Sequence, residues 1–172
     1  MQINGIRLRR ASELDECRRD SSNGRVQSSV HESGPESIKT INPTLEWRGS
    51  FANDELNALH AGCFAHRLAN DDWWGQVNRF SLGWICMRLS GNLVGFVNVA
   101  WDGGVHAFLL DTLVTSALRR RGYATRLVEE AIKHTRGTSC EWLHVDFEPH
   151  LRDFYLGACG FKPTGAGLIS LR

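Results

Sequence analysis

The fold is decided by one stretch of the sequence, Leu109-Leu110-Asp111-Thr112-Leu113-Val114-Thr115-Ser116-Ala117-Leu118-Arg119-Arg120-Arg121-Gly122-Tyr123-Ala124-Thr125-Arg126-Leu127. It begins with a mostly apolar run typical of a strand, and a basic loop with a single glycine follows. Residues 122–136 are predicted to form an amphipathic helix, because their apolar side chains recur at i, i+3 and i+4. Free N–H groups of the loop and first helical turn converge on one place, where the helix dipole adds positive potential. This order therefore predicts a site for a pyrophosphate.

Two other interpretations of the loop stay open from its residues alone. One is a solvated run of charge at the start of a surface helix. The other is a nucleic-acid contact through Arg119–Arg121, although a formal net charge of +1 argues against a polyanion or an anionic membrane as partner. The P-loop pattern is absent, and Gly165-Ala166-Gly167 lacks the following helix that a dinucleotide site requires.

The elements around this stretch follow from hydrophobic periodicity and turn residues. Strands are predicted over 81–89, 93–101 and 106–114, and the tight turns between them make an antiparallel meander. A strand over 141–147 follows the helix, and the crossover makes it parallel to 106–114. Also predicted are a first strand at 45–48, a helix capped by Asn53 or Asp54, a second cap with a short helix or ordered loop at 70–74, a helix over 151–159, and a last strand at 168–171. These elements define an α+β fold with a mixed sheet.

Aromatic residues divide the chain of 172 residues into two parts. Every Trp, Phe and Tyr lies at or after Trp47, and residues 1–43 are rich in Ser, Gly and charge. A segment without aromatic residues buries little apolar surface. We therefore expect residues 1–43 to be a disordered extension, with room for one short helix over Ser12–Arg19. Residues 44–172 are expected to form the working domain.

Cysteine usage and the first residues indicate a cytoplasmic protein. The 5 cysteines are scattered without a C-x-x-C pair, and no basic segment followed by an apolar run opens the sequence. The longest apolar stretch, 93–101, is far shorter than the about 20 residues that a membrane span needs. His60, Cys63 and His66 look like metal ligands. We nevertheless expect no metal, because His66 should turn away from the helix face that carries the other two and no carboxylate completes the set.

Two short motifs resemble those of a known enzyme family. Arg119-x-x-Gly122-x-Ala124 is similar to the Q/R-x-x-G-x-G/A signature of the GNAT N-acetyltransferase superfamily, and Phe154-Tyr155 with Gly160-Phe161 resembles that family's late helix and turn. The likeness covers about residues 44–171. It implies a mixed, mostly antiparallel sheet flanked by helices, in which a splayed pair of parallel strands forms the cleft for acetyl-CoA.

The resemblance also implies an activity. An amine of a small molecule, or one exposed on a protein, would attack the thioester of acetyl-CoA directly. The residues expected to hold acetyl-CoA are Leu113, Val114, Arg119, Arg120, Arg121, Gly122, Tyr123, Ala124 and Thr125. A GNAT-like module that senses acyl-CoA without catalysis is the alternative. The sequence leaves the choice between monomer and homodimer open.

Tyr155 resembles the acid that protonates the departing thiolate in this family. Four residues separate Tyr155 from Gly160-Phe161, where the family usually has three, so strict counting puts Leu156 in the tyrosine position. A bulge in the helix would restore Tyr155. The alternative is a tyrosine that only packs in the core.

The base and the acceptor pocket are expected on or near the strands that flank the cleft. Asp111 and His106 are the candidate bases, and a water relay with no single essential base is the alternative. Strand alternation predicts that His106 shares a face with Thr112 and that Asp111 faces the other way. The predicted acceptor pocket comprises Trp73, Trp74, Trp101, His144 and Asp146. Simple core packing is the alternative role for the three tryptophans.

Overall fold

The computed structural model describes residues 2–3, 6–7 and 42–171, and the chain divides into two compact units, 1–40 and 41–172. In the first unit, strands β1 (Gln2–Ile3) and β2 (Ile6–Arg7) pair antiparallel. Most of the extension expected over residues 1–43, including the helix over Ser12–Arg19, lies outside the described residues.

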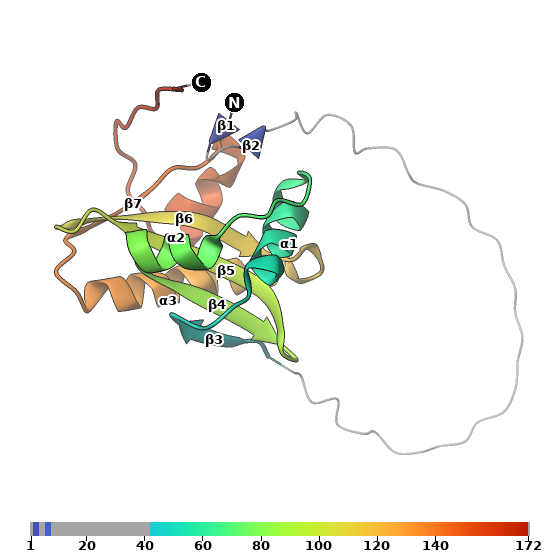
Figure 1. Ribbon diagram of the computed structural model, residues 1–172. Coiled ribbons are helices and arrows are strands. Elements are labelled where there is room, and N and C mark those ends of the chain that lie inside the picture. Colours follow the sequence, from blue (N-terminus) through green and yellow to red (C-terminus); the bar gives the residue numbers. More distant parts are fainter. Residues whose placement is uncertain (1, 4–5, 8–41, 172) are drawn as a thin grey trace, which may run out of the picture. The chain divides into compact units, whose positions relative to one another are not determined.

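The second unit is built on a sheet of five strands in the order β3-β4-β5-β6-β7 (Figure 1). Their bounds are Thr44–Trp47, Ser81–Leu89, Asn92–Trp101, His106–Val114 and Trp142–Val145. Strands β3 to β6 pair antiparallel with one another, and β7 is parallel to β6. The predicted meander and the parallel crossover are confirmed, and so is the mixed α+β fold.

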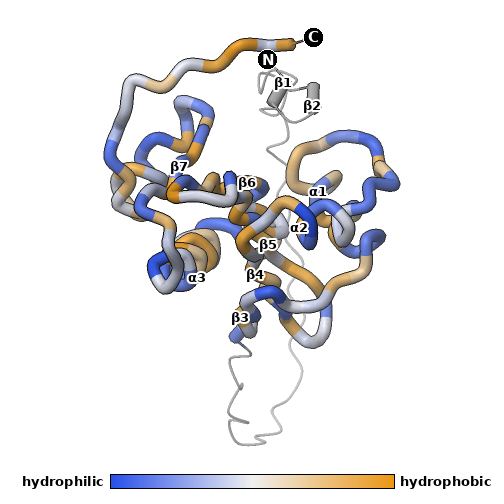
Figure 2. The backbone as a smooth tube through the Cα atoms, turned by 60° about the vertical axis from the view of Figure 1, so that its left-hand side comes forward, coloured by the Kyte–Doolittle hydropathy of each residue, from blue (hydrophilic) through white to orange (hydrophobic). Residues whose placement is uncertain are grey.

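Helices cover both faces of this sheet. The α-helices are α1 (Asn53–Phe64), α2 (Trp73–Phe80) and α3 (Tyr123–Arg136). Short 3₁₀ turns occupy Ser116–Leu118 and Pro149–Leu151, and a π-helix runs over Asp153–Ala158. Figures 1 and 2 show α1 and α2 on one face and α3 on the other.

The N-termini of α1 and α2 are stabilised in different ways. Asp72 caps α2 by accepting a hydrogen bond from the Gly75 N–H. The expected cap of α1 at Asn53 or Asp54 is wrong by one residue. Ala52 holds that position, because the Glu55 carboxylate reaches back and accepts from its N–H.

Strand alternation creates two hydrophobic cores. Val97 and Val99 of β5 pack with Leu127 of α3. Phe96 faces the other way and packs with Leu56 of α1. Figure 2 shows the apolar residues gathered along the central strands and along the inner side of α3. The sheet is therefore the central layer of the domain, and the helices on its two sides bury side chains on both of its faces.

A β-bulge interrupts β6 in the middle of the fold-deciding stretch. Leu110 pairs with Asn98 and Leu113 pairs with Phe96, so two residues, Asp111 and Thr112, oppose one on β5. Asp111 has a φ of 51°, in the left-handed region. The bulge changes which face each later side chain occupies. Leu109 consequently belongs to the core under α3, whereas Leu113 belongs to the core under α1 and α2.

The bulge overturns the predicted faces of β6. Asp111 contacts His60 of α1, and Thr112 reaches Tyr155 in the π-helix. Strict alternation had placed Thr112 on the face of His106 and Asp111 on the opposite one.

The strand predicted over 168–171 is also wrong. Leu168 and Ile169 are 55% and 81% exposed, and residues 159–171 contain no strand. Apolar residues become a strand only where a neighbouring strand supplies hydrogen-bond partners, and none of the described strands pairs with this segment. None of the helices among the described residues is both long and apolar enough to cross a membrane.

Candidate active site

The sheet opens between β6 and β7. Their pairing ends at Leu109 and Val145, while β6 continues for another five residues to Val114. The Thr115 N–H donates to Val94 of β5, so the Val114 peptide before it faces away from β5, toward the opening. This free edge is the main-chain surface that the splayed parallel pair was expected to provide.

The N-terminus of α3 lies directly after this edge. Gly122 precedes α3 with a φ of 78°, and no side chain caps the helix. A Cβ on Gly122 would meet nothing within 4 Å, so the space above the loop is open. The first helical N–H groups, those of Tyr123, Ala124 and Thr125, have no partner within a helix. Uncapped donors, open space and the helix dipole fit a phosphate group.

The three arginines of the loop divide into two kinds. Arg119 donates from Nε to the Val114 carbonyl at 3.1 Å and from a terminal nitrogen to the Cys63 carbonyl at 3.2 Å. Its guanidinium therefore ties the loop to β6 and to the end of α1. Arg120 and Arg121 are exposed, and the described residues form no salt bridge with either. They are the side chains left to face an anion.

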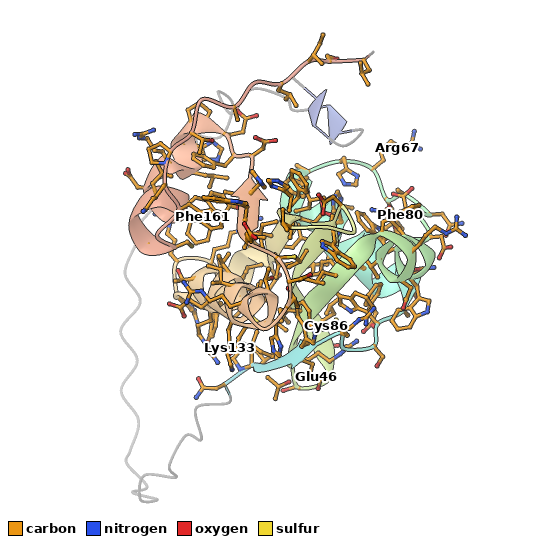
Figure 3. All side chains as sticks on the ribbon, turned by 90° about the vertical axis from the view of Figure 1, so that its left-hand side faces the viewer. Glu46, Arg67, Phe80, Cys86, Lys133 and Phe161 are labelled. Atoms are coloured by element: carbon orange, nitrogen blue, oxygen red, sulfur yellow. The ribbon has the colours of Figure 1, made fainter. Side chains whose placement is uncertain are left out.

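The π-helix explains the extra residue near Tyr155. A π-helix holds one more residue than the equivalent α-helical turn. The backbone accordingly closes from the Cys159 N–H to the Phe154 carbonyl at 2.9 Å. Phe161 follows, and its ring lies edge-on to Tyr155. Figure 3 shows Phe161 beside this helix, on the side of the sheet that carries Lys133 and away from Phe80.

Tyr155 itself is buried, with 6% of its surface exposed. Its ring stacks on Phe147 with centroids 5.1 Å apart, and its side chain is hydrogen-bonded to Thr112. Burial raises the pKa of the Tyr155 hydroxyl above its ordinary value, which outweighs the opposite effect of Thr112. The phenol is therefore protonated at neutral pH and able to donate a proton.

Asp111 lies on the other face of β6 and is paired with a residue that the sequence did not suggest for catalysis. His60 Nε2 is 3.7 Å from the Asp111 carboxylate, and the two side chains are 8% and 7% exposed. A second histidine completes the group, because His66 Nε2 is 2.7 Å from His60 Nδ1. The expectation that His66 turns away is wrong. Ala65 has a φ of 52° and folds the chain back at the end of α1.

Residues 47–161 match the model of the acetyltransferase (GNAT) family. The chain belongs to the GNAT acetyltransferase family. The match includes the opening, the loop before α3 and the π-helix. No curated protein sequence matches the chain.

Several solved structures share the GNAT fold of this chain at low sequence identity. A GNAT-family acetyltransferase from Streptococcus pneumoniae is 18% identical, with a TM-score of 0.60 over 76% of this chain and 99% of the other. Glucosamine-6-phosphate N-acetyltransferase from Arabidopsis thaliana is 13% identical, with a TM-score of 0.58 over 74% and 97%. The aminoglycoside N-acetyltransferase AAC(6')-Iy, solved in complex with CoA, is 15% identical, with a TM-score of 0.60 over 78% and 99%.

The GNAT opening separates the two candidate bases. His106 stands five residues before Asp111, which corresponds to about 16 Å of extended strand. His106 instead contacts His144 of β7, with Nδ1 and Nε2 2.8 Å apart, and Phe108 stacks on the same His144 ring. The two candidates therefore cannot act on one reacting atom. Asp111 is the one that adjoins Thr112, the partner of Tyr155, although Asp111 and Tyr155 lie on opposite faces of β6.

The residues predicted for the acceptor pocket are distributed over the GNAT domain. Trp73 is buried and donates from Nε1 to Asn57 at 3.1 Å, and Trp74 packs edge-on to Phe51 and Trp84. Trp101 pairs in register with Ala107 and donates to the Gly104 carbonyl in the β5–β6 turn. Trp73 thus belongs to the core under α1 and α2, whereas Trp74 packs on that core with 42% of its surface exposed. His144 and Asp146 are exposed, on and just after β7.

The sequence contains only a weak signal for the Asp111–His60 pair. His60 is four residues after Leu56 on the buried side of α1, but a buried histidine is most often a packing residue. The bulge that directs Asp111 toward α1 has no local signature.

The described part of the chain shows no group of three His, Cys, Asp or Glu side chains able to hold a metal ion. The contact between His60 and His66 is short enough for a shared proton.

Proposed function

We propose that this GNAT domain transfers the acetyl group of acetyl-CoA to an amine, carried either by a small molecule or by a protein. One observation carries the proposal: the free edge of β6 leads directly into an uncapped helix N-terminus with two exposed arginines that form no salt bridge with the described residues. Such a surface suits a ligand with an amide-containing arm and a pyrophosphate. The aminoglycoside N-acetyltransferase with the same fold was solved with CoA, which supports the proposal.

The roles in binding follow from the contacts. Leu113 and Val114 border the opening, and the pantetheine arm would lie along the main chain there. The Val114 carbonyl already accepts from Arg119, which leaves the Val114 N–H as the group that faces the opening. Backbone N–H groups from Gly122 to Thr125 would surround the pyrophosphate, and Arg120 and Arg121 would add charge from outside. Arg119 acts by holding the Val114 peptide and the loop in place.

The reaction needs two proton transfers, and the structure offers one group for each. The amine nitrogen forms a bond to the acetyl carbon as the carbon–sulfur bond breaks, so the amine loses a proton and the sulfur gains one. Asp111 is the group proposed to accept the amine's proton, and Tyr155 the one to protonate sulfur. Asp111 and Thr112 are adjacent on the free edge but face opposite sides of β6. Base and acid would thus stand on opposite sides of the reacting carbonyl. The Val114 N–H would stabilise its developing negative charge.

The acceptor amine is proposed to approach from the face of β6 and β7 that carries Phe108, His106 and His144. Phe108 is 42% exposed and lies in contact with His144. Aromatic and imidazole groups at an open edge would hold the acceptor by stacking and hydrogen bonding. Asp146 would add a negative charge at the rim for a cationic acceptor.

Two measurements test the proposed function. Calorimetry with acetyl-CoA should show binding, and release of free thiol in the presence of a panel of amines should show turnover. Binding without turnover for any small or peptide amine would favour the acyl-CoA sensor. Absence of binding at millimolar acetyl-CoA would overturn both. Salt-sensitive binding of generic DNA or RNA that is tighter than CoA binding would instead favour the nucleic-acid contact through Arg119–Arg121.

A further inference from the structure

A buried histidine of α1 lies against the carboxylate of the β6 bulge. His60 Nε2 stands 3.7 Å from Asp111 Oδ1, and both side chains are more than nine-tenths buried. The rings of Phe64 and Trp73 lie 4.7 and 5.0 Å from the imidazole ring. A carboxylate enclosed in this way needs a proton or a cation beside it. Within the described residues, His60 is the one ion-pair partner of Asp111.

A second imidazole continues the contact toward solvent. His66 Nε2 is 2.7 Å from His60 Nδ1, and His66 Nδ1 is 2.6 Å from the Arg67 carbonyl oxygen. His66 is only half-buried, and Figure 3 shows Arg67 on the outside of the molecule. A continuous line of polar groups therefore runs from the free part of β6, through the buried face of α1, to the surface.

Hydrogen-bond chemistry determines how many protons this line holds. A carbonyl only accepts, so His66 Nδ1 must carry a proton. One proton is needed between the two imidazoles, and His60 Nδ1 carries it when both rings are neutral. His60 Nε2 then has a free lone pair that faces the Asp111 carboxylate at 3.7 Å, an ion-pair distance too long for a direct hydrogen bond. Two acceptors therefore face each other at Asp111 and His60. An additional proton taken up by either of them would be shared once the two groups approach.

We propose that Asp111, His60 and His66 form a proton relay that carries the proton released by the acceptor amine from the reacting centre to solvent. The inference rests on the proposed function. Asp111 accepts the proton, and the His60 Nε2 beside it shares it. The proton on His60 Nδ1 then passes to His66 Nε2, and His66 gives one proton to water, so the number of protons is conserved. Asp111 is the catalytic residue, and the two histidines are positioning residues that act through it.

Other charged groups near the relay are few. The Tyr155 hydroxyl lies across β6, and the charge of Asp111 contributes to the raised pKa of Tyr155. The Arg119 guanidinium bonds the Cys63 carbonyl on the same helix as His60. The dependence of turnover on pH should therefore reflect the relay together with these two groups.

The kinetic test compares His66→Ala and His60→Gln with His134→Gln in the full-length protein. His134 is also half-buried, but it stacks on Trp47 at the far end of α3 and serves as the matched control. We expect both relay variants to lower kcat about tenfold at neutral pH, to shift the pH profile of kcat, and to leave the KM for acetyl-CoA unchanged. Added imidazole should restore turnover in His66→Ala, because it can occupy the emptied, solvent-connected position.

Imidazole rescue separates a relay from a purely structural contact. Loss of folding stability would not be reversed by imidazole, nor would it change the shape of the pH profile. Relay variants that behave like His134→Gln, or a loss of turnover that imidazole fails to restore, would overturn the relay. If the wild type itself shows no thiol release with any amine, the proposed function fails instead.

A spectroscopic test needs no turnover. Long-range ¹H–¹⁵N correlation spectra of the histidine rings should show His66 protonated at Nδ1. They should also show His60 Nε2 unprotonated in the resting wild type, with a chemical shift that changes in Asp111→Asn, whose amide would donate to that nitrogen. An unprotonated His66 Nδ1, or His60 signals that are identical in the two proteins, would overturn the relay whatever the activity assay shows.

Discussion

The Nε atom of Arg119 donates a hydrogen bond to the Val114 carbonyl at 3.1 Å, and this contact gives the arginine a role other than charge. Arg119 stands in the family signature, yet its guanidinium bonds two backbone carbonyls of its own chain. The residue joins the three parts that surround the opening: the end of β6, the basic loop and the end of α1.

Arg119→Ala should therefore affect folding as well as binding. We expect it to lower the free energy of unfolding by about 1 kcal/mol, because two charge-assisted bonds at an exposed side chain are lost. It should also weaken acetyl-CoA binding. Arg120→Ala and Arg121→Ala should weaken binding a few-fold, more at low salt, without lowering stability. Urea unfolding and calorimetry measure the two effects, with Arg79→Ala as control. Equal stability of all three variants would contradict the structural role.

Tyr155→Phe should separate acid catalysis from packing. The phenylalanine ring would keep the stack on Phe147, so stability and acetyl-CoA affinity should change little. We expect kcat to fall about 100-fold, since no proton donor remains beside the departing sulfur. The raised pKa of Tyr155 means that wild-type turnover should keep this donor up to at least pH 10 and lose it as pH rises further. Thiol-release kinetics between pH 7 and 10.5 provide the measurement. Full activity of Tyr155→Phe would show that the tyrosine only packs.

Gly122→Ala should lower the free energy of unfolding, because it strains the backbone. The φ of 78° lies in the left-handed region, and the added methyl group would meet open space, so backbone strain is the main effect. We expect a loss of about 1 kcal/mol in unfolding free energy and a smaller loss for Gly122→Asn. Gly62→Ala, inside α1, is the matched control and should stabilise the protein by up to about 1 kcal/mol. Unfolding curves of the three variants check the order.

Cys86 should make the fold sensitive to alkaline pH. Burial raises the pKa of its thiol from 9.0 to about 12, and burial also raises the pKa of Cys159 to about 11. Between pH 9 and these values, the unfolded chain has lost protons that the folded chain still holds. Stability should therefore fall as pH rises above 9, by up to about 1.4 kcal/mol per pH unit for each thiol.

Cys86→Ala isolates that contribution. It should have a shallower decline of unfolding free energy between pH 9 and 10.5 than the wild type, whatever its stability at pH 7. Cys159→Ala should reduce the slope as well. Parallel curves for wild type and both variants would exclude these thiols as the source of the alkaline sensitivity.

The sequence by itself determined the elements whose signals are local. The turns Ser90-Gly91-Asn92 and Asp102-Gly103-Gly104 and the alternation around them predicted β4, β5 and β6, and the 3.6-residue period predicted α3. A crossover of this kind has one favoured hand and direction, so the parallel pairing of β7 followed as well. The anion site in the loop before α3 was also predicted from the sequence, because arginine residues and a glycine at the start of a helix favour binding of a negatively charged group.

Tertiary structure alone decided how the chemical groups meet. One extra residue in β6 turned Asp111 toward α1 and Thr112 toward Tyr155, and a left-handed Ala65 brought His66 to His60. The π-helix accommodated the extra residue before Gly160, and Arg119 found its partners on β6 and α1. Bulges, π-turns and caps of this kind are set by which neighbouring element supplies the hydrogen bonds, and that information is distributed over the whole fold. The periodicity of a strand fixes two faces, but only its pairing decides where that alternation breaks.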